Sequence, residues 1–356
     1  MNQQRLQKVL DNMKQAGLHQ LLVTETEPVY YLTGIWVSPM ERMMALYIRE
    51  DGKVTFFGNK LFAIAPQEGL EMVEPTDSDD PVAQLAAAVL PGELGIDETW
   101  PSRFLIGLMS HRPDVKPVLG SEPVAQATMY KDEEERELMR AASRIDDACI
   151  DMAIHAIREG ITEKELSSKV EHFFQEKGCD HLGFSIVAMG ANGADPHHGT
   201  DGTVLKEGDS IVMDIGAPFN HYWCDMTRTV FYKSASEEQR TVYETVRRAN
   251  EAAIAVVKPG VAFKEIDLAA RKVIEDAGYG EYFTHRTGHS IGMKEHEQPP
   301  VSSECEVIAK PGMIFSIEPG IYLPGKFGVR VEDLVLVTED GCEVLNKYPK
   351  DLIVVE

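Results

Sequence analysis

The sequence predicts an α+β protein with two domains, of which the second contains an internal repeat with pseudo-twofold symmetry. Two observations support this fold class. The chain has 356 residues, enough for two domains with sizeable cores. Similar segments also recur within the chain, and an internal repeat constrains the whole fold. We expect residues 1–127 to form the first domain and residues 128–356 to form the second.

The first domain is expected to mix strands and helices in an α/β arrangement. Asp51-Gly52 lies between two apolar runs and is a hairpin signal. Prolines at positions 113, 117 and 123 indicate irregular chain before the domain boundary. The expected elements are an amphipathic segment over 1–17, strands over 21–23, 45–49 and 53–57, and a helix over 81–90.

The second domain is expected to begin with a long amphipathic helix over residues 132–159. Gly160 is its stop signal, and the acidic residues at its start are favoured by the helix dipole. Two capping boxes, Thr162-x-x-Glu165 and Ser236-x-x-Gln239, begin two further helices. The expected apolar face of the long helix consists of Leu138, Ala142, Ile145, Cys149, Met152 and Ala156.

The internal repeat contains a helical part and a strand part. Residues 160–166 resemble residues 260–266, and each segment is followed by a helical pattern that ends at a glycine. Residues 206–214 resemble residues 310–318, because Lys-x-Gly opens an apolar run in both and an acid follows six residues after the glycine. Two copies of helix, helix and hairpin, each with two carboxylates, predict a pseudo-twofold domain with a site on its axis.

The acids of the repeat are expected to lie close together. Asp214 lies in an apolar strand and Asp225 leads into a second one, so a hairpin between them would place the two acids opposite each other. Adjacent carboxylates repel, and one stays protonated unless a cation lies between them. Either acid alone is equally well explained as a turn or edge-strand residue. Glu318 and Glu332 repeat the pattern, which favours a functional pair in each half.

An imidazole completes a set of candidate metal ligands. Four carboxylates and one histidine suit Mn, Co, Zn or Fe better than a thiolate-rich structural site does. If the five side chains converge, the predicted chemistry is activation of water between two cations. The five candidates are Asp214, Asp225, His289, Glu318 and Glu332.

These residues resemble the motifs of the pita-bread-fold metallopeptidases, namely prolidase, aminopeptidase P and methionine aminopeptidase. The resemblance covers residues 128–356 strongly, and the first ~125 residues resemble the creatinase-like domain that precedes prolidase and aminopeptidase P. It implies a pita-bread catalytic domain whose metal ligands are the five residues above. Ser290 departs from the family pattern, in which Gly is usual.

The resemblance also implies roles for individual residues. Asp225 and Glu332 would bridge two divalent ions, with Mn²⁺ expected and Co²⁺, Zn²⁺ or Fe²⁺ as alternatives. Asp214 would complete the coordination of one ion, and His289 with Glu318 would complete that of the other. Glu318 could also shuttle a proton. The family's further active-site histidines correspond to His197, with His198 as an adjacent rival, to His285 and to His296.

These further residues are expected to bind substrate. His197 and His296 would donate hydrogen bonds to the developing oxyanion and the substrate ends, and His285 would position the substrate. Arg330 shares a strand face with Glu332, because it lies two residues before it. It would orient the site, meet a substrate carboxylate or pair with a neighbouring acid.

The resemblance implies hydrolysis of the Xaa-Pro bond, most directly in dipeptides as in prolidase. Aminopeptidase P, which acts on longer peptides, shares every motif. The extra N-terminal domain argues against methionine aminopeptidase. A family-shaped binding protein without metal, or a creatinase-like hydrolase that works through histidine, is the alternative from another class. A homodimer is expected from the family.

Composition agrees with a soluble enzyme. The net charge of −23 disfavours binding to nucleic acid or to an anionic membrane. We find no apolar span of 18 residues and no signal-peptide pattern. Five cysteines without a CxxC pair indicate reduced thiols in the cytoplasm. Cys224 abuts Asp225 and is either a soft ligand or a packed free thiol.

Overall fold

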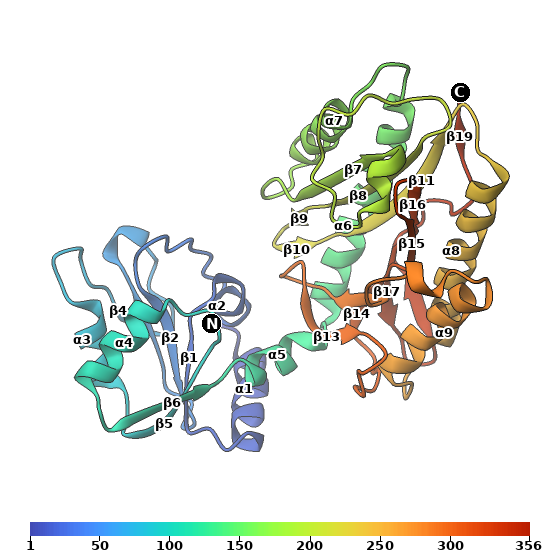
Figure 1. The fold of residues 1–356 in the computed structure, drawn as a ribbon. Helices are drawn as coiled ribbons and strands as arrows, with labels where there is room; N and C mark the ends of the chain where they lie inside the picture. The colour runs from blue at the N-terminus through green and yellow to red at the C-terminus, as the bar shows by residue number, and fades with distance from the viewer. The chain divides into compact units, whose positions relative to one another are not determined.

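The computed structural model of the protein describes all 356 residues. The chain divides into two compact units, Met1–Thr128 and Met129–Glu356, whereas the sequence placed the boundary after residue 127. Figure 1 shows the first unit in blue to teal and the second in green to red. No helix is both long and apolar enough to cross a bilayer.

The first unit is an α/β fold around a six-stranded mixed sheet in the order β4-β3-β2-β1-β5-β6. A buried apolar cluster joins side chains of the sheet to helices α3 and α4. The strands are β1 Gln20–Val23, β2 Met44–Arg49, β3 Val54–Gly58, β4 Glu71–Val73, β5 Gly92–Ile96 and β6 Val115–Leu119. The helices are α1 Gln3–Gln15, α2 Thr26–Thr33, α3 Pro81–Ala88, α4 Ser102–His111 and α5 Glu122–Met129.

The local signals of the first unit predicted most of these elements. β2 and β3 form the expected antiparallel hairpin, and Gly52 adopts φ 83° in its turn, a conformation that glycine adopts without strain. The expectation of irregular chain around Pro117 was wrong, because Pro117 lies inside β6. β6 pairs only with β5 at the edge of the sheet, where a residue without an N–H is tolerated.

The second unit consists of two similar halves, and both show the predicted order of two helices followed by a sheet. The sheets have the orders β19-β11-β8-β7 and β13-β12-β14-β17-β18. Isolated bridges Thr162↔Val204 and Ala262↔Ile308 recur at equivalent places, as expected for a repeat. The first half contains α6 Glu133–Ala156, α7 Glu163–Glu176, β7 Phe184–Met189, β8 Ser210–Gly216 and β11 Met226–Tyr232. The second contains α8 Glu237–Val256, α9 Phe263–Asp276, β12 Gly288–Ser290, β13 Glu297–Val301, β14 Ile314–Ile317, β17 Asp333–Val337 and β18 Cys342–Val344, and β19 Val354–Val355 joins the first sheet.

Both predicted capping boxes are present, and Asp132 with Glu135 forms a third one at the start of α6. The predicted apolar face of α6 was partly wrong. Ala142 and Cys149 are buried, but the buried face also includes the polar Ser143 and Asp146. These two polar residues obscured the true face, because helical periodicity assigns polar positions to the solvent side.

The paired strands carry the acids to one place. In the β8–β11 ladder Asp214 lies opposite Thr227, so Asp225 is its diagonal neighbour on the same face rather than its direct partner. The ladder of β14 and β17 ends at Ile317↔Asp333, and Glu318 and Glu332 lie just beyond it. Each half therefore delivers two carboxylates from the end of an antiparallel strand pair.

Candidate metal centre

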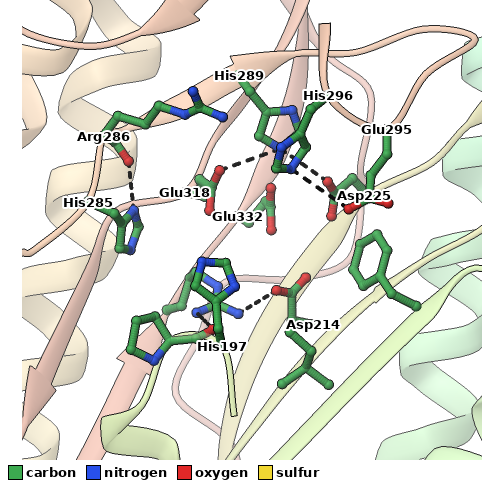
Figure 2. A pocket seen from close by; sticks show the side chains of 14 residues that line it. His197, Asp214, Asp225, His285, Arg286, His289, Glu295, His296, Glu318 and Glu332 are labelled. Atoms are coloured by element: carbon green, nitrogen blue, oxygen red, sulfur yellow. Dashed lines mark hydrogen bonds and ion pairs between the residues drawn. The ribbon is translucent and has the colours of Figure 1, made fainter. Parts of the chain in front are cut away.

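A cavity of about 200 Å³ in the second unit contains every site residue that the sequence predicted. Figure 2 shows the carboxylates and histidines pointing toward one another across it. His198, the rival of His197, does not line the cavity. The predicted residues in the lining are His197, Asp214, Asp225, His285, His289, His296, Glu318, Arg330 and Glu332; the others are Phe184, Ile186, Pro196, Arg286 and Glu295.

Three of the candidate ligands form the tightest cluster. Asp225, His289 and Glu332 each offer a ligand atom within 4.8 Å of the other two, and all three are buried. His289 Nε2 lies 3.4 Å from Asp225 Oδ2 and 3.6 Å from Glu318 Oε1. The carbonyl of Ser290 accepts a 3.1 Å hydrogen bond from His289 Nδ1, which leaves Nε2 directed at the acids.

The acids are held in place from outside the cluster. Thr227 Oγ1 donates a 2.7 Å hydrogen bond to Glu332 Oε2, and Ser316 Oγ donates one of 3.2 Å to Glu318 Oε1. Asp214 Oδ1 and Asp225 Oδ1 are buried and have no hydrogen-bond partner. Because a buried polar atom without a partner is costly, these two oxygens mark a place for a cation.

The electrostatics of the cluster favour the same conclusion. Burial raises the pKa of Asp225 to about 7, with Asp214 and Glu318 adding to the shift and His289 opposing it. Burial and the neighbouring acids raise the pKa of Glu332 well above its usual range. Burial alone would lower the pKa of His289, but Asp225 and Glu318 raise it to about 9. A set of acids that retain protons because of burial and mutual repulsion fits divalent cations, which would replace those protons.

Arg330 lines the cavity, but its guanidinium is engaged with other groups of the protein. It is 3% exposed and forms an ion pair with Asp214 Oδ2. Its Nε donates to Thr227 Oγ1 at 3.0 Å, and its Nη1 donates to the Tyr322 hydroxyl at 2.8 Å and to the Pro196 carbonyl at 3.4 Å. The sequence left three roles open for Arg330. The structure shows one of them, an ion pair with the neighbouring acid Asp214.

The three histidines around the ligands differ in their surroundings. His285 is fixed at both nitrogens, because its Nε2 lies 2.8 Å from the Tyr322 hydroxyl and its Nδ1 lies 2.7 Å from the Arg286 carbonyl. Its pKa is lowered by burial. The ring of His296 lies 3.9 Å from that of His289, centroid to centroid. Burial, and then the charge of His289, lower the pKa of His296 to about 4.

The side chains of His197 and His198 lie in different surroundings. His197 is exposed at the cavity and labelled in Figure 2. His198 Nε2 donates a 2.9 Å hydrogen bond to Glu163 Oε2, and Glu163 is fully buried. The Glu163 carboxylate also accepts hydrogen bonds from Met189 N, Asn192 Nδ2 and Asp201 N. These hydrogen bonds hold both ends of the loop that carries His197.

Sequence reasoning missed two charged residues of the cavity, Arg286 and Glu295. Each directly follows or precedes a predicted histidine, His285 or His296, and that adjacency was the available signal. Cys224 does not line the cavity. Its thiol is buried 3.2 Å from the Ala217 carbonyl, and burial raises its pKa well above the usual range, which is typical of a packed thiol.

Comparisons with known proteins match both domains of the chain. Residues 137–339 match the model of metallopeptidase family M24, and residues 5–128 match that of the Creatinase/Prolidase N-terminal domain. The putative dipeptidase YkvY of Bacillus subtilis is 35% identical, over 98% of this chain and 99% of that protein. A dipeptidase structure from Pyrococcus horikoshii has a TM-score of 0.94 at 35% identity, over 98% of this chain and 99% of its own. A prolidase structure from Thermococcus sibiricus has a TM-score of 0.94 at 34% identity, over 99% of each chain.

The matches to both domains cover nearly the whole chain and confirm the predicted fold class, a pita-bread catalytic domain preceded by a creatinase-type domain. Dipeptidases and prolidases recur among the similar proteins. The chain therefore belongs to metallopeptidase family M24 and is a hydrolase of peptide bonds.

Proposed function

We propose that this peptidase holds two divalent metal ions on its five candidate ligands and cleaves the bond before proline in Xaa-Pro dipeptides. The observation that carries the proposal is the convergence of four carboxylates and one histidine on one cavity, with a buried, unpartnered oxygen on Asp214 and on Asp225. Five ligands exceed what one catalytic ion with an open position needs. The oxygen-rich donor set favours Mn²⁺.

The five candidate ligands would hold the two ions. They are Asp225 and Glu332, the second acid of each half, together with Asp214, His289 and Glu318. When bound, the two ions supply an activated water and stabilise the charge that develops on the peptide oxygen.

Side chains of the protein transfer the proton and stabilise the oxyanion. Glu318, whose Oε1 is held by Ser316, accepts a proton from the attacking water and passes it to the leaving proline nitrogen. His296 is neutral near pH 7 because of its low pKa, and it donates a ring N–H to the carbonyl oxygen as negative charge develops there. His197, at the cavity wall, holds the substrate by a further hydrogen bond.

Arg286 is the group that we assign to the substrate carboxylate. It lines the cavity, its side chain is exposed, and it makes no side-chain hydrogen bond or ion pair within the chain. Arg330, by contrast, is occupied by Asp214, Thr227 and Tyr322. His285 binds the Arg286 carbonyl and so fixes the backbone from which this guanidinium extends. A cation at this wall favours a substrate whose chain ends in a carboxylate.

The test compares Leu-Pro, Leu-Pro-amide and Leu-Pro-Leu with the Mn²⁺-loaded enzyme. We expect rapid hydrolysis of Leu-Pro and much slower hydrolysis of the other two. Equal cleavage of Leu-Pro-Leu would contradict the dipeptidase proposal and identify an Xaa-Pro aminopeptidase instead. The homodimer and the cytoplasmic location expected from the sequence stay predictions.

A further inference from the structure

Glu295 lines the cavity but does not belong to the ligand set. It lies in the turn between β12 and β13, directly before His296, and its side chain is 41% exposed. In Figure 2 it enters beside Asp225, on the opposite side of His289 from Arg286. The cavity therefore has a carboxylate on one wall and a guanidinium on the other.

Glu295 forms no ion pair with a lysine or arginine side chain. The basic atom within ion-pair distance of it is His296 Nε2, 3.8 Å from Glu295 Oε1, and the charge of His289 also acts on this carboxylate. A carboxylate on a cavity wall that pairs with no lysine or arginine of the protein can attract a cationic group of a ligand.

The turn that carries Glu295 is rigidly held. Glu297 Oε2 forms a 2.7 Å ion pair with Lys131 Nζ, and the Lys131 side chain is only 2% exposed. Glu297 Oε1 also accepts from Lys294 N at 3.3 Å. On the other side of the turn, Trp223 N donates to the Gly292 carbonyl at 2.8 Å. These contacts fix the backbone around Glu295, as a preorganised recognition group requires.

An apolar surface accompanies the carboxylate in the same cavity. Phe184 and Ile186 project from β7 into the lining, and Phe184 stacks on Trp223 with ring centroids 6.2 Å apart and planes inclined by 15°. Lysine and arginine side chains combine an apolar stem with a charged end. The apolar wall matches the stem of such a side chain, and the Glu295 carboxylate, which pairs with no lysine or arginine of the protein, matches its charged end.

We propose that Glu295 binds the cationic side chain of the substrate's first residue, so that the enzyme prefers dipeptides that begin with lysine or arginine. This inference rests on the proposed function, since it places a dipeptide in this cavity. Arg286 would then hold the carboxylate end of the substrate, and Glu295 the side chain at the other end. The α-amino group is common to all dipeptides and does not contribute to the preference.

The experiment compares Lys-Pro with norleucine-Pro, which has the same straight stem and lacks the ammonium group. For the Mn²⁺-loaded wild type we expect kcat/KM to be higher for Lys-Pro by about fivefold or more, the scale of one partly exposed charge pair. Glu295→Gln should reduce that ratio to about one and retain the bound metal. The matched control is Glu304→Gln, an exposed acid outside the cavity, which should keep the wild-type ratio.

A second measurement does not depend on any variant. Raising the salt concentration should reduce the Lys-Pro to norleucine-Pro ratio of the wild type, because salt screens an exposed charge pair. An unchanged ratio in Glu295→Gln, or loss of metal from that variant, would overturn the inference. If Xaa-Pro dipeptides are not hydrolysed, the proposed function fails, and the same ratio is then measured with Xaa-Ala dipeptides to decide on Glu295 separately.

Discussion

Arg286 and Arg330 are two cations in one cavity, and their contacts give them different roles. Arg330 is buried and paired with Asp214, a residue 116 positions away in the sequence. No local pattern encodes such a partner, so the sequence located Arg330 in the site but left its role open. Arg286 is exposed at the cavity and makes no side-chain hydrogen bond.

Arg286→Gln should raise KM for Leu-Pro by about tenfold, because a hydrogen bond between charged groups is lost. The gap in kcat/KM between Leu-Pro and Leu-Pro-amide should narrow in the same variant, since the amide never made this contact. Steady-state kinetics on both substrates, with metal content as the control, provide the check. A variant that discriminates against the amide as strongly as the wild type would exclude Arg286 as the carboxylate ligand.

His296→Ala should lower kcat by about 10²-fold, the scale of losing one oxyanion donor. Bound metal should be unchanged, because His296 is not among the five candidate ligands. His172→Ala is the matched control, since His172 is an exposed helical histidine whose only ion pair is with Glu176. Wild-type turnover in His296→Ala, or loss of its ions, would speak against the assigned role.

At the scale of elements, the two halves of the second unit begin their second helices with different caps. Thr162 accepts a hydrogen bond from Glu165 N at the start of α7, whereas Ala262 at the start of α9 offers no side-chain cap. The cap hydrogen bond can therefore be removed from the first half and added to the second.

Thr162→Ala should lower the free energy of unfolding by about 1 kcal/mol, because a cap hydrogen bond is lost. Ala262→Thr should raise it by up to about the same amount, because Glu265 already stands at the position that completes a capping box. Denaturant unfolding of the two variants would show shifts in opposite directions. Shifts in the same direction would mean that the two helix starts are not equivalent.

The same elements show what the sequence could predict. Helix starts, the hairpin at Gly52 and the acid-bearing strands carry local signals, and the structure contains all of them. The buried face of α6 and the edge strand β6 were mispredicted, since burial of Asp146 and pairing of a Pro-containing strand depend on distant neighbours. The turn that carries Glu295 also has a distant partner, because Glu297, two residues further on, pairs with Lys131.

At the scale of the whole molecule, the metal-free site should make stability depend on pH. The pKa of Asp225 is raised to about 7 and that of His289 to about 9, so both groups bind protons more tightly in the folded chain than in the unfolded one. Their contribution is complete below the unfolded pKa values and is lost as pH rises through the folded ones. The melting temperature of the metal-free protein should therefore fall as pH rises from about 4 to about 9.

Bound metal should weaken this dependence, because the ions take the place of the protons. Thermal melting across this pH range, with and without Mn²⁺, gives the comparison. A metal-free protein that becomes more stable with rising pH would show that the acids are not crowded in the way the structure indicates.

The central claim is that one cavity holds two divalent ions on five protein ligands and that hydrolysis depends on them. The most direct measurement is the number of Mn²⁺ ions per chain after loading and desalting, followed by activity on Leu-Pro after exhaustive chelation. We predict two ions per chain in the wild type, fewer in Asp225→Asn, and loss of activity on chelation that added Mn²⁺ restores. A single ion per chain, or full activity in the chelated enzyme, would contradict the claim.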